Sequence, residues 1–205
     1  MRTLRMFPTS INSDYIDIAV NDMRDGKPII YPTDTLYAIG CDALNNRAVE
    51  NICRIKSIDP KKHFLSVVCA DISQASVYAR IDNKAFAILK QYLPGSYTFI
   101  LPAATTLPKI FKGRHQVGIR IPDNPITLQL ASALGNPILS STADWPDANE
   151  DITLPEAIAD HFAHSGIDLF IDEGECLSTL PSTIVDLTDS SSPVVIREGK
   201  GHFDF

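Results

Sequence analysis

The sequence lacks the features that mark several large classes of protein. It has no long apolar run, and no hydrophobic signal segment follows Met1 to Arg5. Since a membrane-spanning helix needs roughly 18 consecutive apolar residues, we expect no membrane contact and a cytosolic protein. The sequence also has no Gly-x-Gly-x-x-Gly and no Gly-x-x-x-x-Gly-Lys-Ser/Thr motif. This absence argues against a standard dinucleotide site or P-loop, so a nucleotide would need a different cradle.

Metal-ligand patterns are missing as well. The sequence contains no Cys-x-x-Cys pair and no zinc-ligand spacing among its four cysteines, Cys41, Cys53, Cys69 and Cys176. These mostly lie in apolar surroundings, so we expect buried, reduced thiols. His161 and His164 lie three residues apart on an expected helix, but no neighbouring residues complete a ligand set. A position at the surface or the core edge is therefore favoured for both histidines.

What the chain does contain is enough apolar material for one sizeable core. Its 205 residues are 44% apolar, and we expect a single soluble globular domain over residues 1–205. The net charge of −7 argues against indiscriminate binding of nucleic acid, but it is unevenly distributed. Two clusters are basic: Arg54, Lys56, Lys61, Lys62 and His63, and Lys109, Lys112, Arg114, His115 and Arg120. Residues 144–175 instead carry ten acidic side chains and no lysine or arginine. Each basic cluster is a candidate anion site or, alternatively, a solvated surface.

Apolar residues alternate between helical and strand spacing, which is typical of an α/β or α+β domain. Helices are expected over 13–25, 48–56, after Asp71 and Asp82 as caps, over 124–134, and from a Thr153–Glu156 capping box to about His164. In the first of these helices, Ser13 is the expected N-cap and Gly26 lies just past the end. Strands are expected over 28–31, 36–39, 64–69, 96–101, 117–121, 137–140, 168–171, 183–187 and 193–197.

Thr33, Asp34 and Thr35 interrupt two apolar runs, so they lie where one expected strand ends. They can form a ligand site or a hairpin connection with Asx or Ser/Thr turn chemistry. Hydroxyls and cations recur at such ends: Thr33, Thr35, Lys56, Arg120, Ser141, Thr142, Ser182, Thr183 and Arg197. Because ligands of open α/β sheets bind in the strand-end crevice, this recurrence favours a polar cleft that accepts anions. Trp145 would cap this cleft or anchor its own loop.

Five segments together resemble proteins of the YrdC-domain family, most closely the YciO branch. The segments are 31–40 (Tyr-Pro-Thr-Asp-Thr-Leu-Tyr-Ala-Ile-Gly), 54–56 (Arg-Ile-Lys), 94–101 (Pro-Gly-Ser-Tyr-Thr-Phe-Ile-Leu), 117–125 (Val-Gly-Ile-Arg-Ile-Pro-Asp-Asn-Pro) and 181–186 (Pro-Ser-Thr-Ile-Val-Asp). The resemblance covers about residues 10 to 200. It implies an α/β fold in which a twisted, open sheet of mixed parallel and antiparallel strands, with flanking helices, carries a concave basic cavity.

The resemblance also implies a reaction, because YrdC enzymes make threonylcarbamoyl-AMP. L-threonine, bicarbonate and ATP give threonylcarbamoyl-adenylate and pyrophosphate, on the way to threonylcarbamoyladenosine in tRNA. By resemblance, Thr33 and Thr35 contact threonine, and Lys56 and Arg120 act as catalytic residues on the ATP phosphates. Ser141, Thr142, Ser182, Thr183 and Arg197 line the nucleotide site. ATP would be a substrate with Mg²⁺, without a tightly bound cofactor and without a protein nucleophile.

The sequence departs from the synthase pattern at two places. Ile58 stands where the family has the arginine of Lys-x-Arg, so one phosphate contact is missing unless Lys61 or Lys62 replaces it. Asp144 stands where the family has the asparagine of Ser-Ala-Asn, and it either turns away or helps to hold Mg²⁺. Two other functions therefore stay open: a non-catalytic module that binds tRNA or double-stranded RNA, and a sensor that binds a nucleotide without turnover.

Overall fold

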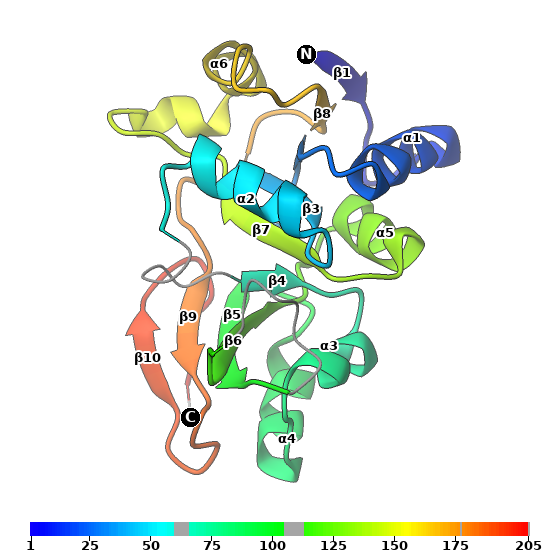
Figure 1. The fold of residues 1–205 in the computed structure, drawn as a ribbon. Helices are drawn as coiled ribbons and strands as arrows, with labels where there is room; N and C mark the ends of the chain where they lie inside the picture. Colours follow the sequence, from blue (N-terminus) through cyan, green and yellow to red (C-terminus); the bar gives the residue numbers. More distant parts are fainter. Residues whose placement is uncertain (60–65, 105–112, 177, 205) are drawn as a thin grey trace.

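A computed structural model describes residues 1–59, 66–104, 113–176 and 178–204. Its strands form one ten-stranded sheet in the order β1-β8-β2-β3-β7-β4-β6-β5-β9-β10 (Figure 1). Their bounds are β1 Arg2–Arg5, β2 Ile29–Tyr31, β3 Ala38–Asp42, β4 Ser66–Val68, β5 Tyr97–Pro102, β6 Gln116–Arg120, β7 Ile138–Thr142, β8 Leu169–Asp172, β9 Thr183–Asp186 and β10 Val194–Arg197. Pairs such as β2 with β8 are parallel and pairs such as β3 with β7 are antiparallel, so the predicted mixed sheet is confirmed.

The strands come where the sequence predicts them, with one addition. β1 was not predicted, because Leu4 is the one buried residue in its four and no apolar run marks it. β1 nevertheless pairs in parallel with β8 at the edge of the sheet. The expected strand over 36–39 begins later, at Ala38, so Leu36 and Tyr37 belong to the connection after β2. That connection carries the Thr-Asp-Thr segment.

The helices are α1 Ser13–Arg24, α2 Asn46–Ile55, α3 Ile72–Tyr78, α4 Asn83–Tyr92, α5 Pro125–Leu134 and α6 Pro155–His161. The predicted caps of α3, α4 and α5 are confirmed, since Asp71, Asp82 and Asn124 each accept a backbone N–H of the first turn. Two of the predicted helix N-caps were wrong. Asn12, not Ser13, accepts the N–H of Asp14 at the start of α1.

The second wrong cap is the expected Thr153–Glu156 capping box. Thr153 lies in a 3₁₀ helix, Asn149–Thr153, and Leu154 precedes α6 without a side-chain cap. Pro155 occupies the first helical position, where a missing backbone N–H has no cost. Thr153 therefore ends the 3₁₀ helix and does not cap α6.

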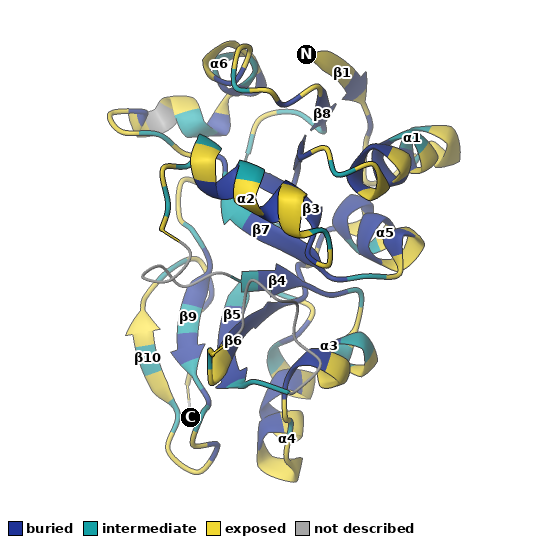
Figure 2. Ribbon diagram, viewed as in Figure 1, coloured by how far each residue is buried: buried dark blue, intermediate teal, exposed yellow. Residues whose placement is uncertain are grey.

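Apolar residues on the two faces of the sheet build two cores, because successive side chains of a strand point to opposite faces. Ile29 and Tyr31 pack with residues of α1 and α5, whereas Ile30 packs in the core that α2, α4 and α6 help to form. Figure 1 shows α1 and α5 side by side and α2 crossing β3 and β7. The central strands are buried and β10 at the edge is largely exposed (Figure 2). That residues 1–205 form one domain stays a prediction.

Buried hydrogen bonds hold the connection after β2 in place. Thr127, in the first turn of α5, donates from Oγ1 to the carbonyl oxygen of Pro32 at 2.5 Å. At the other end, Tyr37 donates from its hydroxyl to the carbonyl oxygen of Gly174 at 2.6 Å and accepts the N–H of Glu173 at 2.9 Å. The Thr-Asp-Thr segment is therefore fixed between α5 and the segment after β8. None of the described helices is long and apolar enough to cross a membrane.

Candidate functional site

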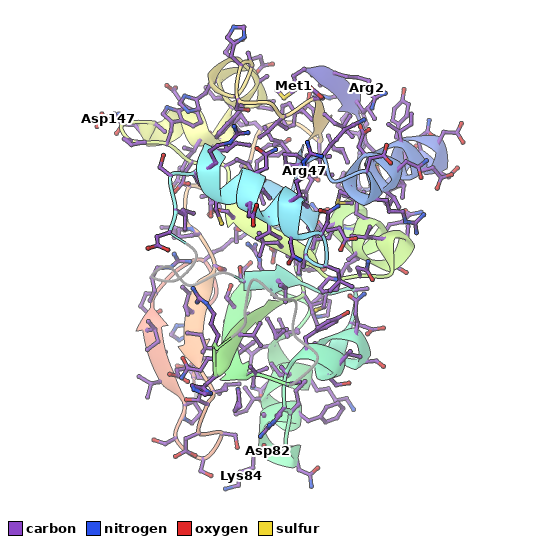
Figure 3. The ribbon with its side chains drawn as sticks, viewed as in Figure 1. Met1, Arg2, Arg47, Asp82, Lys84 and Asp147 are labelled. Atoms are coloured by element: carbon purple, nitrogen blue, oxygen red, sulfur yellow. The ribbon has the colours of Figure 1, made fainter. Side chains whose placement is uncertain are left out.

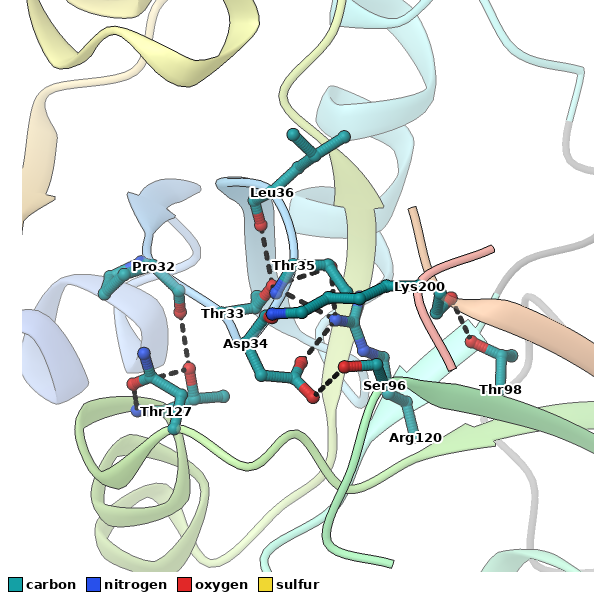
Figure 4. A network of polar contacts seen from close by, with 12 residues as sticks. Pro32, Thr33, Asp34, Thr35, Leu36, Ser96, Thr98, Arg120, Thr127 and Lys200 are labelled. Atoms are coloured by element: carbon teal, nitrogen blue, oxygen red, sulfur yellow. Dashed lines mark hydrogen bonds and ion pairs between the residues drawn. The ribbon is translucent and has the colours of Figure 1, made fainter. Parts of the chain in front are cut away.

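Arg120 is the last residue of β6, and its guanidinium donates hydrogen bonds to the segment after β2 (Figure 4). Its Nη2 donates to Asp34 Oδ1 at 2.7 Å, to Thr35 Oγ1 at 2.6 Å and to Thr33 Oγ1 at 3.1 Å. The Arg120 and Asp34 side chains are only 9% and 6% exposed. Sequence segments 85 to 87 residues apart thus meet in one buried polar cluster.

The threonines also have turn chemistry of their own. Thr33 Oγ1 donates to the carbonyl oxygen of Leu36 at 2.7 Å and accepts the N–H of Thr35 at 3.1 Å. The turn interpretation is therefore correct for the backbone. It does not compete with the ligand interpretation, because Thr33 and Thr35 still line a cavity.

That cavity, here called the acidic cavity, has a volume of about 620 Å³. It is lined by Pro8, Thr33, Asp34, Thr35, Gly95, Ser96, Asp123, Asn124, Pro125, Glu173, Glu175, Cys176 and Lys200. Ser96 donates to Asp34 Oδ2 at 3.0 Å, and Lys200 Nζ donates to the Asp34 carbonyl oxygen. The cavity thus offers hydroxyls and both signs of charge, which suits a small zwitterionic ligand.

Glu173 differs from the other carboxylates of this region in its partner. Asn124 Nδ2 donates to its two oxygens at 3.1 and 2.9 Å. Burial raises the pKa of Glu173, the Asn124 hydrogen bond opposes this, and the charges of Asp172 and Asp34 raise it further. A carboxylate with a raised pKa in a cavity is a typical feature of a functional site.

A second cavity, here called the hydroxyl cavity, has a volume of about 310 Å³. It is lined by Ile58, Ser66, Thr98, Ile100, Arg120, Ser140, Ser141, Thr142, Ser182, Ile184, Ile196 and Arg197. Five residues predicted to bind the nucleotide meet here: Arg120, Ser141, Thr142, Ser182 and Arg197. The sequence predicted one polar cleft from these residues, and the structure brings them together. The expected reason was wrong, because the end of β6 at Arg120 lies level with the start of β7 at Ile138 and not with its end at Thr142.

Two guanidinium groups make the hydroxyl cavity suited to an anion. Arg197 Nη2 donates to the carbonyl oxygen of Ser182 at 2.7 Å. Burial lowers the pKa of Arg197, the nearby charge of Arg120 lowers it further, and Asp144 acts in the opposite direction. Arg120 Nε is buried without a hydrogen-bond partner in the described part of the chain. A bound anion would lower the cost of this crowded positive charge.

Lys56 is already engaged by an acid. It follows α2 and donates from Nζ to Asp144 Oδ1 at 2.5 Å and to the Asp144 carbonyl oxygen. The Lys56 side chain is 12% exposed and that of Asp144 is 55% exposed. Of the two roles considered for Asp144, the structure shows neither, because its carboxylate pairs with the lysine predicted to bind phosphate.

Thr183 lies apart from the other predicted nucleotide contacts. It is fully buried, its Oγ1 donates to the carbonyl oxygen of Gly201 at 2.5 Å, and it accepts the N–H of Gly199 at 2.9 Å. These bonds fix the segment that ends in Lys200. A nucleotide contact for Thr183 stays a prediction.

Five residues of the basic clusters lie outside the described residues: Lys61, Lys62, His63, Lys109 and Lys112. Whether Lys61 or Lys62 replaces the missing arginine therefore stays untested.

Within the described ranges, no group of three or more His, Cys, Asp or Glu side chains could hold a metal ion. His161 stacks on Trp145 with ring centroids 4.3 Å apart. Trp145 therefore anchors its loop to α6.

The cysteines are all free thiols. Cys41, Cys53 and Cys69 are buried, as predicted, while Cys176 is half-buried and lines the acidic cavity. Burial raises the pKa of the Cys176 thiol to about 11, so it is uncharged near neutral pH. None of them is activated as a nucleophile by its surroundings.

Thr33 and Thr35 were the predicted site residues of the acidic cavity, and sequence reasoning missed its other polar residues, among them Ser96, Asn124, Glu173 and Lys200. Asn124 was identified only as the start of a helix and as part of the segment 117–125, and Glu173 only as one of the acidic residues of 144–175. Ser96 lies in the family segment 94–101 but was given no role there, and Lys200 belongs to none of the five segments. A useful signal was that Ser96 and Asn124 are each the first residue of an expected element, and in the structure they directly precede β5 and α5.

Comparisons with known proteins identify the family and the fold of this chain. A family model for Sua5, YciO and YrdC proteins, described as telomere recombination, matches residues 21–199. An uncharacterized protein of Haemophilus influenzae is 42% identical over 199 residues, which cover 95% of this chain and 93% of that protein. YciO of Escherichia coli is 40% identical over 196 residues, with the same shares of the two chains.

The crystal structure of E. coli YciO matches with a TM-score of 0.88 at 38% identity, covering 98% of this chain and 97% of that one. A threonylcarbamoyl-AMP synthase of Pyrococcus abyssi is 32% identical over 186 residues, covering 90% of this chain but 54% of the synthase. A crystal structure of P. abyssi Sua5 complexed with L-threonine matches with a TM-score of 0.85 at 29% identity, covering 97% of this chain and 58% of that one.

Proposed function

This chain belongs to the Sua5, YciO and YrdC family, and on that premise we propose that it is a threonylcarbamoyl-AMP synthase. It would form threonylcarbamoyl-adenylate and pyrophosphate from L-threonine, bicarbonate and ATP. The observation that carries the proposal is the position of Arg120, which lines the hydroxyl cavity and bonds Thr33 and Thr35 of the acidic cavity. One guanidinium can therefore act on ligands in both cavities.

The acidic cavity is the proposed site of threonine. Thr33 and Thr35 offer hydroxyls, and the nearby cations of Arg120 and Lys200 favour a carboxylate. The L-threonine in the P. abyssi Sua5 structure supports this assignment of the ligand. The acidic cavity of this chain has a volume of about 620 Å³, which leaves room for bicarbonate beside threonine.

The hydroxyl cavity is the proposed site of the ATP phosphates. Arg120 and Arg197 supply positive charge, and Ser141, Thr142 and Ser182 supply hydroxyl donors. A carbamate oxygen would attack the α-phosphorus and expel pyrophosphate, with bound cations stabilising the charge that develops. The work of the protein is to hold several anions in line, which requires no protein nucleophile. The described residues contain no group of three or more His, Cys, Asp or Glu side chains that could hold Mg²⁺, and no step here depends on the metal.

A second candidate is ATP binding without turnover, which the ion pair between Lys56 and Asp144 favours. The pair keeps a phosphate-binding lysine occupied, and Ile58 lines the hydroxyl cavity where the family has an arginine. Binding of tRNA or double-stranded RNA stays a prediction. The residues described here add no observation in its favour.

Pyrophosphate release tests the proposal. Purified protein with ATP, bicarbonate and Mg²⁺ should release pyrophosphate only when L-threonine is added. Lys56→Ala should lower that rate by at least about tenfold, since it removes a charge-assisted contact worth roughly 1.5–3 kcal/mol. The matched control is Lys84→Ala, because Lys84 lies near the start of α4 and contacts Ser191 (Figure 3). No threonine-dependent release by the unmodified protein at high concentration would refute the proposal.

A further inference from the structure

Glu173 lines the acidic cavity with its backbone and side chain both held in place. It directly follows β8, and its N–H donates to the Tyr37 hydroxyl at 2.9 Å. Its carboxylate accepts Asn124 Nδ2 through both oxygens. The residue shares the cavity with Thr33 and Thr35, so a ligand held by their hydroxyls lies in the cavity that Glu173 also lines.

Two of the carboxylates around Glu173 have cationic partners, and two others that line the cavity, Asp123 and Glu175, are exposed. Asp34 is paired with Arg120 at 2.7 Å, and Asp172 is paired with Arg5 at 2.5 Å. Glu173 has no ion pair within the described ranges, and its partner is a neutral amide. The other titratable groups that face it are Asp123, Glu175, Cys176, Lys200 and Tyr37. Lys200 is engaged by the Asp34 carbonyl oxygen.

An unpaired carboxylate beside a pair of hydroxyls is arranged to receive an ammonium group. The amine of an amino acid attacks carbon only in its neutral form, so formation of a carbamate requires that a proton first leaves the ammonium. Burial together with the charges of Asp172 and Asp34 raises the pKa of Glu173, which makes it a better proton acceptor than an ordinary glutamate. The Asn124 hydrogen bond opposes that rise in pKa, because it stabilises the ionised carboxylate.

We propose that Glu173 is the general base that takes a proton from the α-ammonium of the amino acid bound in the acidic cavity. The inference rests on the proposed function. It adds to that function a residue which no sequence motif indicates.

The step balances without any further reactant. One N–H bond of the ammonium breaks, and the proton passes to the Glu173 carboxylate, which becomes a carboxylic acid. The neutral amine then attacks the carbon of bicarbonate: the C–N bond forms, the C–OH bond breaks, and the hydroxide leaves as water with a second proton from the nitrogen, which gives the carbamate. Glu173 returns its proton to solvent before the next turnover. Asn124 is a positioning residue in this scheme, because it orients the carboxylate without contacting the substrate.

The test is the pH profile of threonine-dependent pyrophosphate release by Glu173→Gln. Glutamine keeps the size of the side chain and an oxygen for the Asn124 amide, but it accepts no proton. We expect kcat to fall by about 100-fold or more near pH 7. The loss should shrink steadily at higher pH, because the amine there loses its proton to solvent. The control is Glu156→Gln, an exposed glutamate in the first turn of α6, which should leave the profile unchanged.

A merely structural or binding role gives a different profile. A loss by the same factor at every pH, or a rise in KM for threonine with kcat unchanged, would overturn the inference while leaving the proposed function intact. If the unmodified protein releases no pyrophosphate with threonine, the proposed function fails and the base role fails with it. The two failures are therefore distinguished within one experiment.

Asn124→Asp provides a second test that does not remove the base. The aspartate keeps the oxygen that caps α5 but loses the amide donor and brings a second negative charge. Both changes raise the pKa of Glu173, so the acidic limb of kcat/KM should move to higher pH by about one unit. An unmoved limb would show that a different group controls it, and would overturn the inference.

Discussion

Replacing Asp144 by asparagine should free Lys56 for phosphate. Lys56 Nζ donates to Asp144 Oδ1 at 2.5 Å, and ATP must compete with that carboxylate for the same ammonium. Asparagine keeps the shape of the side chain and removes its charge. The contact of Lys56 with the backbone carbonyl oxygen at position 144 is unaffected by this change.

The size of the effect follows from the burial of the pair. Fully exposed ion pairs contribute about 0.2–1 kcal/mol, whereas hydrogen bonds to charged groups contribute roughly 1.5–3 kcal/mol. Lys56 is mostly buried but Asp144 is 55% exposed, which places this pair between the two ranges. A gain of about 1 kcal/mol corresponds to about a fivefold lower Kd for ATP. Removing a negative charge beside the phosphates acts in the same direction.

Calorimetric titration with ATP at low and high salt measures this change. The difference between the two proteins should shrink at high salt, because salt screens a half-exposed pair. The matched control is Asp147→Asn, since Asp147 lies at the exposed tip of the same loop and its positive φ of 64° is one that asparagine tolerates (Figure 3). An unchanged or higher Kd in Asp144→Asn would show that Lys56 does not bind phosphate, and would refute this reasoning.

Two further predictions concern stability. Arg120→Ala should lower the free energy of unfolding by roughly 3–5 kcal/mol in urea titrations, because it leaves the buried Asp34 carboxylate unpaired, and adding Asp34→Asn should recover part of the loss. Equal losses in the single and double variants would contradict this. The pKa of Asp82 is lowered, chiefly by the N–H of Ala85, so its stabilising effect is complete above its unfolded pKa and is lost as the pH falls through its lower folded value. Asp82→Ala should therefore be less stable than the unmodified protein at neutral pH, and the two should converge in acid. If the difference in stability between the two proteins stayed constant down to the acid-unfolding range, the lowered pKa of Asp82 would not be its cause.

The local features of the fold could be predicted from the sequence. Asn124 before Pro125 and Gly135 after Leu134 mark both ends of α5, because capping depends on residues a few positions apart. β1 could not be predicted, because its single buried residue acquires a role only by pairing with β8. The predicted start of α6 was wrong, because the helix begins with Pro155 at its first position and has no side-chain cap. Proline is favoured at that position, so the helix can begin without a capping box.

The functional site also has features that the sequence predicts and contacts that it does not. The hydroxyls and cations of the hydroxyl cavity could be identified from the sequence, but their arrangement could not. Val68 pairs with Arg120 and with Ile138, so Arg120 at the end of β6 lies level with the start of β7, and Thr142 lies at the opposite end of that strand. The partners of those residues were not predictable. Lys56 and Asp144 are separated by 88 positions, and Asn124 and Glu173 by 49. Such pairs depend on the packing of distant elements, which no local pattern records.

The central claim is that this chain joins threonine, bicarbonate and ATP into one adenylate. Its most direct test is mass spectrometry of the products formed from L-threonine, ATP and ¹³C-labelled bicarbonate. The account predicts threonylcarbamoyl-adenylate that carries the label, in an amount that falls when Lys56 or Glu173 is substituted. Tight binding of ATP with no labelled adenylate at any enzyme concentration would contradict the account and would identify a nucleotide-binding protein without this activity.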